Sequence, residues 1–396
     1  CSYNPEPIAE FFDLFYIGEG ETAYRKLLDV YKEVKEKGGS RQEFLLRAAR
    51  EVPGMYVPSL YEVSYKEDGT IASFVPTKEG VPAKITKEIV MDLDNAPYPE
   101  KPVVPFIRAT QDRVVLEIQR GCIRGCRFCQ AGSVYKPLRE KSLETLKKLA
   151  IDMLKATGNE EISLSSLSTS DYSKIKELID FLIEECKSRH INISLPSLRI
   201  DAFSLDVMSK VQDVKKSSIT FAPEAGTQRM RNVINKGLTE EDIINGCTQA
   251  FSAGWNKVKL YFMLGQPTET NDDVDGIMDL CEKIAEVYYE TVPKEQRKGK
   301  CQITASSSFF VPKPFTPFQW APMCEAHTFL DKAKRVNDKL KTLLNRKSIR
   351  YNWHESDISV LEGLLARGDR RLSKLILSVY EKGGIYDAWS ECFKKE

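Results

Sequence analysis

The chain has 396 residues, of which 42% are hydrophobic and 29% charged, and its 58 Lys and Arg residues nearly balance its 57 Asp and Glu residues. This composition is typical of a globular protein, and the near-zero net charge gives no global sign of a nucleic-acid partner. The longest apolar runs are far shorter than the roughly 18 residues of a membrane-spanning helix, so we expect no membrane partner.

The start of the chain combines a Cys at position 1 with a segment that predicts ordered structure. Residues 12–36 predict a short strand, a tight turn at residues 18–20 and a helix whose apolar face carries Leu27, Leu28 and Tyr31. This is the pattern of the last unit of an α/β layer whose earlier strands are missing. We therefore expect a fragment of a longer protein rather than a mature lipoprotein, in which a flexible tether would follow the first Cys.

Residues 52–105 are rich in Pro and predict a β-hairpin around the turn Asp68-Gly69, followed by a linker. After this segment, strand-like and helical runs alternate at about thirty-residue spacing, which predicts repeated βα units around a parallel sheet. The expected strands are residues 114–118, 161–167, 191–196, 217–222, 257–264 and 303–310. Six units are fewer than the eight of a complete barrel. Past Trp320 we expect mainly helices.

The ten cysteines are too sparse for a disulfide scaffold in a chain of this length, and their usage fits a reducing cytoplasm. Seven are scattered singly, namely Cys1, Cys186, Cys247, Cys281, Cys301, Cys324 and Cys392. The other three, Cys122, Cys126 and Cys129, form a CxxxCxxC array just after the first expected strand of the parallel sheet. Parallel α/β folds collect their active sites at such strand ends.

The array favours an iron–sulfur cluster over zinc. A structural zinc site closes a tetrahedron of four ligands, and this array has three thiols and no second pair. A four-iron cluster held by three Cys keeps one iron without a protein ligand, where chemistry can occur. Gly121, Gly125 and Gly132 let the backbone bend around a cluster, and the amides of such a loop can hydrogen-bond its sulfurs. The alternative is three buried thiols in a helix.

The segment CIRGCRFC, with Phe128 before the last Cys, resembles the signature of the radical S-adenosylmethionine (SAM) superfamily. More closely, the chain resembles an uncharacterised bacterial family that joins a cobalamin-binding-like domain to a radical SAM barrel. This likeness is carried by residues 4–21, 117–132, 163–172, 222–231 and 311–320. The resemblance implies an α/β fold built on a partial (βα)6 TIM-like barrel of the radical SAM type.

The resemblance also implies a domain order. Residues 1–37 are the C-terminal remnant of a cobalamin-binding-like domain, residues 38–105 a linker with a helix and a β-hairpin, residues 106–322 the partial barrel, and residues 323–396 a helical C-terminal region. The implied cofactors are one four-iron four-sulfur cluster on the three Cys, SAM on the open iron, and cobalamin in the full-length protein. The implied chemistry is one-electron cleavage of SAM to methionine and a 5′-deoxyadenosyl radical, which abstracts hydrogen from an unknown substrate. An electron donor such as flavodoxin or ferredoxin is the expected partner.

Two segments are candidates for SAM contacts. Glu224, at the end of an expected strand, resembles a family position whose carboxylate reaches SAM; the alternative is a helix-start residue that pairs with Arg229 or Arg231. Many superfamily members carry a Gly-Gly-Glu-like motif after the second strand, where this chain has Ser and Thr instead. Ser166 and Ser168 can supply acceptors there, or they cap the next helix.

Arg199 and Gly265 are two further candidates. Arg199 can bind the SAM carboxylate, and the alternative is an ion pair with Asp201. Gly265 resembles a family position at which the backbone approaches adenine, whereas its neighbours Met263 and Leu264 are expected to fill the barrel.

The later part of the chain offers two weaker signals. Residues 306–320 combine Pro with aromatic residues, which indicates either a rim with Lys313 and Gln319 facing a substrate or a connector docked by its aromatic side chains. The basic run over residues 339–350, with Arg367, Arg370 and Arg371 beyond it, indicates either contact with RNA phosphates or ordinary charged helix faces.

The reaction is not defined by these patterns. Relatives with a cobalamin domain often methylate unactivated carbons, whereas methylthiotransferases need three further upstream cysteines that this chain does not contain. A rival class is an iron–sulfur scaffold or RNA-binding protein without turnover. The SAM-like segments at the later strand ends favour an enzyme.

Overall fold

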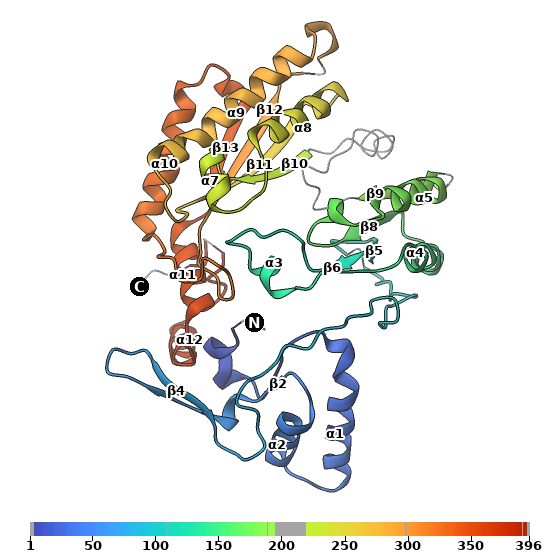
Figure 1. Cartoon of the computed structure of the whole chain (residues 1–396), viewed down its shortest axis with the longest axis vertical. Helices are drawn as coiled ribbons and strands as arrows, with labels where there is room; N and C mark the ends of the chain where they lie inside the picture. Colours follow the sequence, from blue (N-terminus) through green and yellow to red (C-terminus); the bar gives the residue numbers. More distant parts are fainter. Residues whose placement is uncertain are drawn as a thin grey trace. The chain divides into compact units, whose positions relative to one another are not determined.

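The computed structural model describes residues 4–107, 109–187, 189–194, 219–297, 299–389 and 391–393. The chain divides into two units, and Figure 1 labels the elements of both. Unit 1 comprises Cys1–Pro97 and Leu364–Glu396, and unit 2 comprises Tyr98–Gly363.

Unit 1 contains short strands and helices from both ends of the chain. Its helices are α1 (Tyr24–Glu36), α2 (Arg41–Glu51) and α12 (Leu372–Glu381), with 3₁₀ turns η1 (Glu6–Phe11), η2 (Gly20–Thr22) and η3 (Pro58–Leu60). Two antiparallel pairs are formed by β1 (Phe15–Tyr16) with β2 (Met55–Tyr56) and by β3 (Tyr61–Tyr65) with β4 (Ile71–Pro76). The predicted strand, turn and helix near the start of the chain and the predicted hairpin are confirmed.

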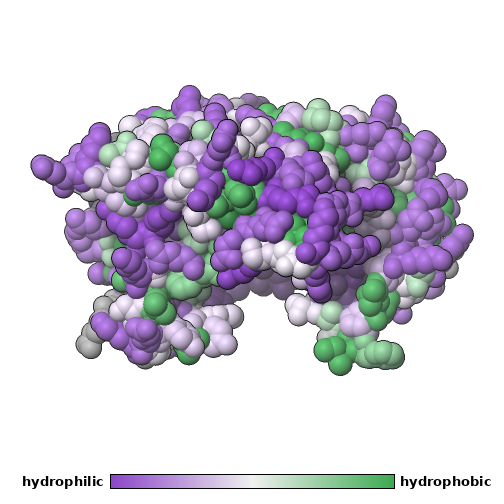
Figure 2. Space-filling view, turned by 90° about the horizontal axis from the view of Figure 1, so that it is seen from below, coloured by the Kyte–Doolittle hydropathy of each residue, from purple (hydrophilic) through white to green (hydrophobic). Residues whose placement is uncertain are grey.

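Helix α1 has two apolar faces, and the predicted residues are divided between them, since Leu27 packs against the core of unit 1 and Leu28 and Tyr31 do not. Val30 and Val34 are buried in the core of unit 1, whereas Leu28 and Tyr31 are 63% and 48% exposed. Residues four apart share a helix face, so both pairs of apolar positions satisfy the same periodicity. Only the packing partner, which lies elsewhere in the sequence, decides between them. On the face that Figure 2 shows, hydrophobic residues form separate patches among mainly hydrophilic ones.

One arginine ties the two ends of the chain together within unit 1. Arg370 Nε donates to the Glu6 carboxylate at 2.9 Å, and its Nη2 donates to the Tyr56 hydroxyl at 3.0 Å. Nearby, the buried Ser373 hydroxyl donates to the Pro7 carbonyl at 3.0 Å. The C-terminal helix is therefore bonded to the N-terminal segment within unit 1.

Unit 2 is built on parallel strands. These are β5 (Val114–Glu117), β8 (Glu161–Ser165), β9 (Asn192–Ser194), β10 (Ile219–Glu224), β11 (Lys257–Leu264), β12 (Gln302–Phe309) and β13 (Ile349–Trp353). They form one sheet in the order β5-β8-β9 and another in the order β10-β11-β12-β13, with every pairing parallel. A short antiparallel pair, β6 (Gln119–Arg120) and β7 (Arg139–Glu140), follows β5. All six predicted strands are present, within a few residues at each end.

Past Trp320 the described structure is mainly helical, as expected, but strand β13 was not predicted. The strand has the sequence IRYNW and pairs in parallel with β12 from Ile303 to Ser307. Only Ile349 and Tyr351 of this strand are buried. Five residues with two apolar positions facing the core give too short an alternation to stand out from the helical segments on either side.

Helices follow the strands of unit 2. They are α3 (Gln130–Val134), α4 (Leu143–Thr157), α5 (Ile175–Lys187), α7 (Gln228–Val233), α8 (Glu240–Ser252), α9 (Asn271–Thr291), α10 (Ala326–Thr342) and α11 (Ser356–Arg367), with 3₁₀ turns η4 (Thr169–Asp171), η5 (Lys294–Gln296) and η6 (Arg346–Ser348). Their starts are set locally, because Thr239 and Thr270 form capping boxes with Asp242 and Asp273. Among the described residues, none of the helices combines the length and the apolar character needed to span a membrane.

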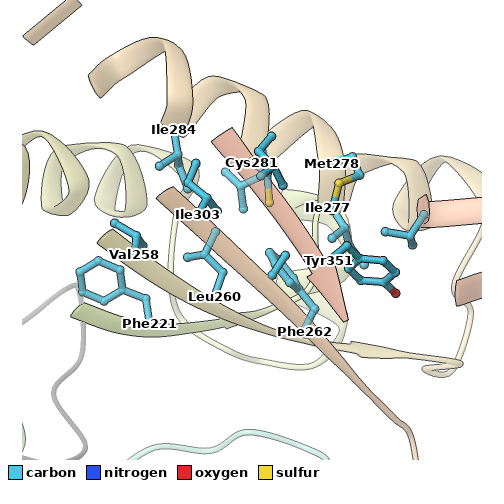
Figure 3. Close-up of a cluster of buried hydrophobic side chains, with 14 of the residues drawn as sticks. Phe221, Val258, Leu260, Phe262, Ile277, Met278, Cys281, Ile284, Ile303 and Tyr351 are labelled. Atoms are coloured by element: carbon cyan, nitrogen blue, oxygen red, sulfur yellow. The ribbon is translucent and has the colours of Figure 1, made fainter. Parts of the chain in front are cut away.

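The main core of unit 2 lies on one face of the β10–β13 sheet. On β11, Val258, Leu260, Phe262 and Leu264 are buried at every second position, so one face of the strand packs against α8, α9 and α10. Figure 3 shows these side chains between the strands and α9. The opposite face of the same strands is polar.

The turn between β10 and α7 contacts α9 at main-chain distance. A Cβ atom at Gly226 would overlap the main-chain nitrogen of Ile277. Beside it, the Thr227 hydroxyl and the Arg229 guanidinium both donate to the Asp273 carboxylate. Burial opposes ionisation of Asp273, but these donors hold its pKa below the usual range. The turn is therefore fixed by packing and by charge.

We predict that Gly226→Ala lowers the free energy of unfolding by roughly 3 kcal/mol or more, because the added methyl group has to displace the backbone of α9. Gly158→Ala is the control. Its added Cβ meets nothing within 4 Å, so only the left-handed φ of 69° opposes it, at about 1 kcal/mol. Chemical denaturation measures both variants. Equal losses would contradict the close approach of Gly226 to α9.

Candidate iron–sulfur site

The three cysteines of the CxxxCxxC array lie in the loop that follows β5 and β6. The thiols of Cys122, Cys126 and Cys129 are partly exposed. The loop, residues 121–129, is here called the cysteine loop. It ends where Cys129 caps α3, its thiol accepting the Gly132 amide. The loop thus begins just past the carboxyl end of the first parallel strand, as predicted.

Backbone amides of the cysteine loop and of α3 point at two of the thiols. The Arg124 amide lies 3.4 Å from Cys122 Sγ, and the Gly132 amide lies 3.3 Å from Cys129 Sγ. Such N–H···S contacts stabilise thiolates and tune clusters that they ligate. The predicted amide-to-sulfur bonding is confirmed at these two positions.

At two of the three predicted glycines, a side chain would clash with atoms around the loop. Gly121 has a φ of 88°, and a Cβ there would lie 2.7 Å from the carbonyl oxygens of Tyr135 and Pro137. A Cβ at Gly125 would lie 2.9 Å from Asn235 Nδ2. At Gly132 the nearest atom is Cys129 Sγ at 3.4 Å, an ordinary contact. The first two glycines allow the tight path of the chain.

The donor set fits a four-iron cluster and not a single metal ion. Within the described part of the chain, no three His, Cys, Asp or Glu side chains converge so as to hold one ion. A tetrahedral zinc site requires such convergence. In a four-iron cluster each thiolate ligates a different iron, so the three thiols can stay apart while the amides support their sulfurs.

The turn after α7 holds the cysteine loop from one side. The Arg127 amide donates to the Ile234 carbonyl at 2.9 Å, and its Nη1 donates to the Val233 carbonyl at 2.6 Å. Asn235, in the left-handed region with a φ of 53°, donates from Nδ2 to the Gly125 carbonyl at 2.8 Å. These bonds join the loop to the segment that follows β10.

Residues 313–320 hold the same loop from another side. The Phe318 amide donates to the Arg127 carbonyl at 3.2 Å, and Gln130 Nε2 donates to the Pro314 carbonyl at 3.2 Å. The ring of Phe318 packs with Phe128 on a small buried cluster around Met230. Phe318 docks as the connector alternative expects, whereas Phe315 and Trp320 are exposed, so the rim alternative stays open.

The two polar residues predicted to face a substrate on that segment are engaged within the protein. Lys313 forms an ion pair with Glu362. Gln319 Oε1 accepts the Phe315 amide at 3.1 Å. Both side chains stabilise the connector, and their contact with a substrate stays a prediction.

Glu224 ends β10 in the left-handed region, with a φ of 66°. Its carboxylate pairs with Lys236 at 3.3 Å, and its carbonyl accepts Nε2 of the buried Gln266 at 2.8 Å. The predicted alternative partners are both occupied elsewhere, Arg229 by Asp273 and the buried Arg231 by the carbonyls of residues 225 and 226. Neither Lys236 nor Gln266 was predicted.

The serines after β8 form a polar network with the cysteine loop. Ser168 Oγ donates to Asp171 at 2.6 Å and makes no capping bond to a backbone amide, while Ser166 bonds to Thr169 at 3.1 Å. The same Asp171 carboxylate, only 6% exposed, accepts two bonds from Arg124, at 2.5 and 3.0 Å. Arg124 and Asp171 were not predicted as a pair, because their separation in the sequence gives no signal of contact.

Gly265 has a packing reason of its own. The φ of Gly265 is 79°, and a Cβ atom there would overlap the ring of Phe329. The Gly265 amide donates to the buried Glu269 at 2.8 Å. The predicted approach to adenine is untested, as are the SAM contacts of Glu224, Ser166 and Ser168. Arg199 and its alternative partner Asp201 lie outside the described residues.

The basic residues proposed for RNA are partly engaged in the protein. Lys339 pairs with Asp279 at 2.9 Å, Arg370 pairs with Glu6 at 2.9 Å, and Arg371 pairs with Asp369 at 2.6 Å. These three ion pairs favour the interpretation as ordinary charged surfaces over contact with RNA. Arg350 differs, because it lies on β13.

The fold and this site define a partial βα barrel with a three-thiol loop at its first strand. The family model for the radical SAM superfamily matches residues 116–281, and the model for the N-terminal part of radical SAM proteins matches residues 1–58. An uncharacterized protein of Methanocaldococcus jannaschii is 33% identical over 370 residues, which are 93% of this chain and 70% of the relative. The chain belongs to the radical SAM superfamily, as the cysteine array predicted.

Two further likenesses are more distant. An uncharacterized methyltransferase of Pyrococcus horikoshii is 24% identical over 273 residues, which are 67% of this chain and 52% of that protein. The solved structure of OxsB, a cobalamin-dependent SAM radical enzyme with aqua-cobalamin and SAM bound, is 17% identical with a TM-score of 0.52. The match covers 96% of this chain and 56% of OxsB, and it shows the shared fold. The chain thus spans about half the length of both proteins.

We predict that the loop is held in place before any iron binds, and that Asn235 contributes to this. Asn235→Gly keeps the left-handed backbone but removes the bond to Gly125. In the iron-free protein, Cys126 and Cys129 should then react with iodoacetamide roughly threefold to tenfold faster, because the loop opens more often. Mass spectrometry measures each thiol, with Cys392 as the internal control. Unchanged rates would mean that the loop is held without this bond.

Proposed function

We propose that the chain is a radical SAM enzyme that cleaves SAM reductively at a four-iron four-sulfur cluster and uses the 5′-deoxyadenosyl radical on a substrate. The observation that carries this proposal is the cysteine loop. Its three thiols follow the first parallel strand, and backbone amides already point at two of their sulfurs. Membership of the superfamily, which uses this cluster and SAM, supports the same conclusion.

Cys122, Cys126 and Cys129 would hold three irons, and the fourth would take SAM. When bound, the cluster supplies the single electron that splits SAM into methionine and the 5′-deoxyadenosyl radical. The protein's own residues would orient SAM and the substrate and exclude water from the site. The Arg124 and Gly132 amides would stabilise negative charge on two thiolates, and the bonds of the cysteine loop to its neighbours would hold the three thiols in place for the cluster.

The SAM contacts are part of the proposal. Glu224 and Gly265 end adjacent strands, and Gln266 joins the two ends through the Glu224 carbonyl. Ser166 and Ser168 lie beyond β8, on the network that reaches Arg124 through Asp171. These side chains come from the carboxyl ends of three parallel strands, where βα folds place bound ligands. Arg199 stays a candidate for the SAM carboxylate.

The proposal extends to the whole protein in three respects. Residues 1–37 are taken as the end of a cobalamin-binding-like domain, supported by the N-terminal family match and by the exposed second apolar face of α1. Methyl transfer is the first reaction class to test, since one relative is named a methyltransferase. Reduction by flavodoxin or ferredoxin in the cytoplasm would supply the electron.

We predict that the reconstituted, reduced protein converts SAM to 5′-deoxyadenosine, and that Cys126→Ala abolishes this to background because one iron loses its ligand. Cys392→Ala is the matched control, a partly exposed thiol outside the loop, and should keep full activity. Anaerobic incubation with chromatography of the products measures both. A wild-type protein that holds a cluster but neither binds nor cleaves SAM would favour an iron–sulfur scaffold.

A further inference from the structure

Strands β10–β13 have a second face that differs from the barrel interiors of related folds. Strands of parallel sheets are usually buried on both faces, and complete βα barrels are filled by branched apolar side chains. Here only the helix-covered face is apolar. On β11 the residues between the buried ones include Lys259 and Tyr261, both exposed, Tyr261 by 45%.

The strand register places polar side chains of this face in rows. Lys259 pairs with Thr220 on one side and Thr304 on the other, and Thr304 pairs with Arg350. In the next row, Tyr261 pairs with Ser306. Because alternate residues of a strand share a face, all of these residues lie opposite the buried core. We call this set, Thr220, Lys259, Tyr261, Thr304, Ser306 and Arg350, the open polar face.

The open polar face is cationic and its charges are not compensated. Neither Lys259 nor Arg350 has an ion-pair or hydrogen-bond partner within the residues that the structure describes. The strand sequences KVKLYFML, QITASSSF and IRYNW contain no acidic residue, and β10 has only Glu224, at its end, which is paired with Lys236. Two strand spacings separate Lys259 from Arg350, about 10 Å.

This face leads to the cysteine loop. Strand β10 ends at Glu224, and the turn after the following helix α7 bonds to Gly125 and Arg127 of that loop. Along β11, five residues separate Lys259 from the carboxyl end at Leu264, which is about 16 Å at the usual rise of a strand. A molecule that spans this distance reaches from the cations to the carboxyl end of β11.

We propose that the open polar face binds the anionic group of the substrate, a phosphate or a carboxylate. Lys259 and Arg350 neutralise the anion, and the Thr220 and Thr304 hydroxyls in the same row donate hydrogen bonds to it. Tyr261, one row nearer to the carboxyl ends, packs against the part of the substrate that follows. The substrate is therefore an elongated anion whose reacting atom lies on the order of 16 Å from its charged group.

This inference rests on the proposed function for the position of the reacting atom, while the binding of the anion is independent of SAM cleavage. Arg350 was first grouped with a basic run of possible RNA contacts. Its place on β13, beside Thr304, separates it from that run and joins it to Lys259.

The test is isothermal titration of the full chain, purified anaerobically, with sodium pyrophosphate and, separately, with sodium citrate at constant ionic strength. The variants are Lys259→Gln and Arg350→Gln. Lys259→Arg keeps the charge. Lys176→Gln, an exposed lysine of α5, is the matched control for loss of one positive charge.

Saturable binding of either anion to the wild type is expected, with affinity reduced roughly fivefold to tenfold in each Gln variant and retained within about threefold in Lys259→Arg. Lys176→Gln should bind as the wild type does. Preference for pyrophosphate indicates a phosphate-bearing substrate, and preference for citrate a carboxylate. Absent binding, or equal weakening by Lys176→Gln, overturns the proposal. No SAM or reductant is present, so a chain that failed to cleave SAM would still report on the anion site.

Discussion

The hydrogen bonds between the cysteine loop and the turn after α7 are the constraint on which the site depends. A loop with a CxxxCxxC spacing has too many accessible conformations to present three thiols in a fixed array by itself. The bonds from Asn235 to Gly125 and from Arg127 to Ile234 tie it to the turn after α7, and the Phe318 amide ties it to the connector after β12. The position of the loop therefore depends on the β10–β13 sheet. That sheet is in turn held by the hydrophobic core that it forms with α9.

The same dependence explains what could be predicted from the sequence. The cysteine array, its glycines and the strands that alternate with helices are local signals, read from spacing and periodicity. The partners of the site are not local. Asp171 meets Arg124, Lys236 meets Glu224, and Gln266 bridges two strand ends only because the fold brings distant segments together. Strand β13 was not predicted for a related reason. Its alternation of buried and exposed residues is short, and only the pairing with β12 identifies it as a strand.

The two faces of the β10–β13 sheet differ in chemistry because apolar and polar residues alternate along its strands. Alternation in KVKLYFML gives the helix-covered face its Val, Leu and Phe side chains, and it gives the opposite face its Lys and Tyr side chains. The run alone predicts a strand that fills the barrel, with Met263 and Leu264 inside. Leu264 belongs instead to the core on the helix side, because its position in the alternation matches that of Phe262.

Unit 1 joins the first and last segments of the chain, with Arg370 and Ser373 bonded to residues near the start. On the ribosome, the N-terminal part of unit 1 emerges long before the helix that binds it. Synthesis of the intervening Tyr98–Gly363 takes on the order of tens of seconds at usual rates of elongation. The hydrophobic core of unit 1 lies between Phe15 and Val81 and is complete in sequence before this interval begins. The bonds from Arg370 and Ser373 are therefore among the last contacts of the fold to form.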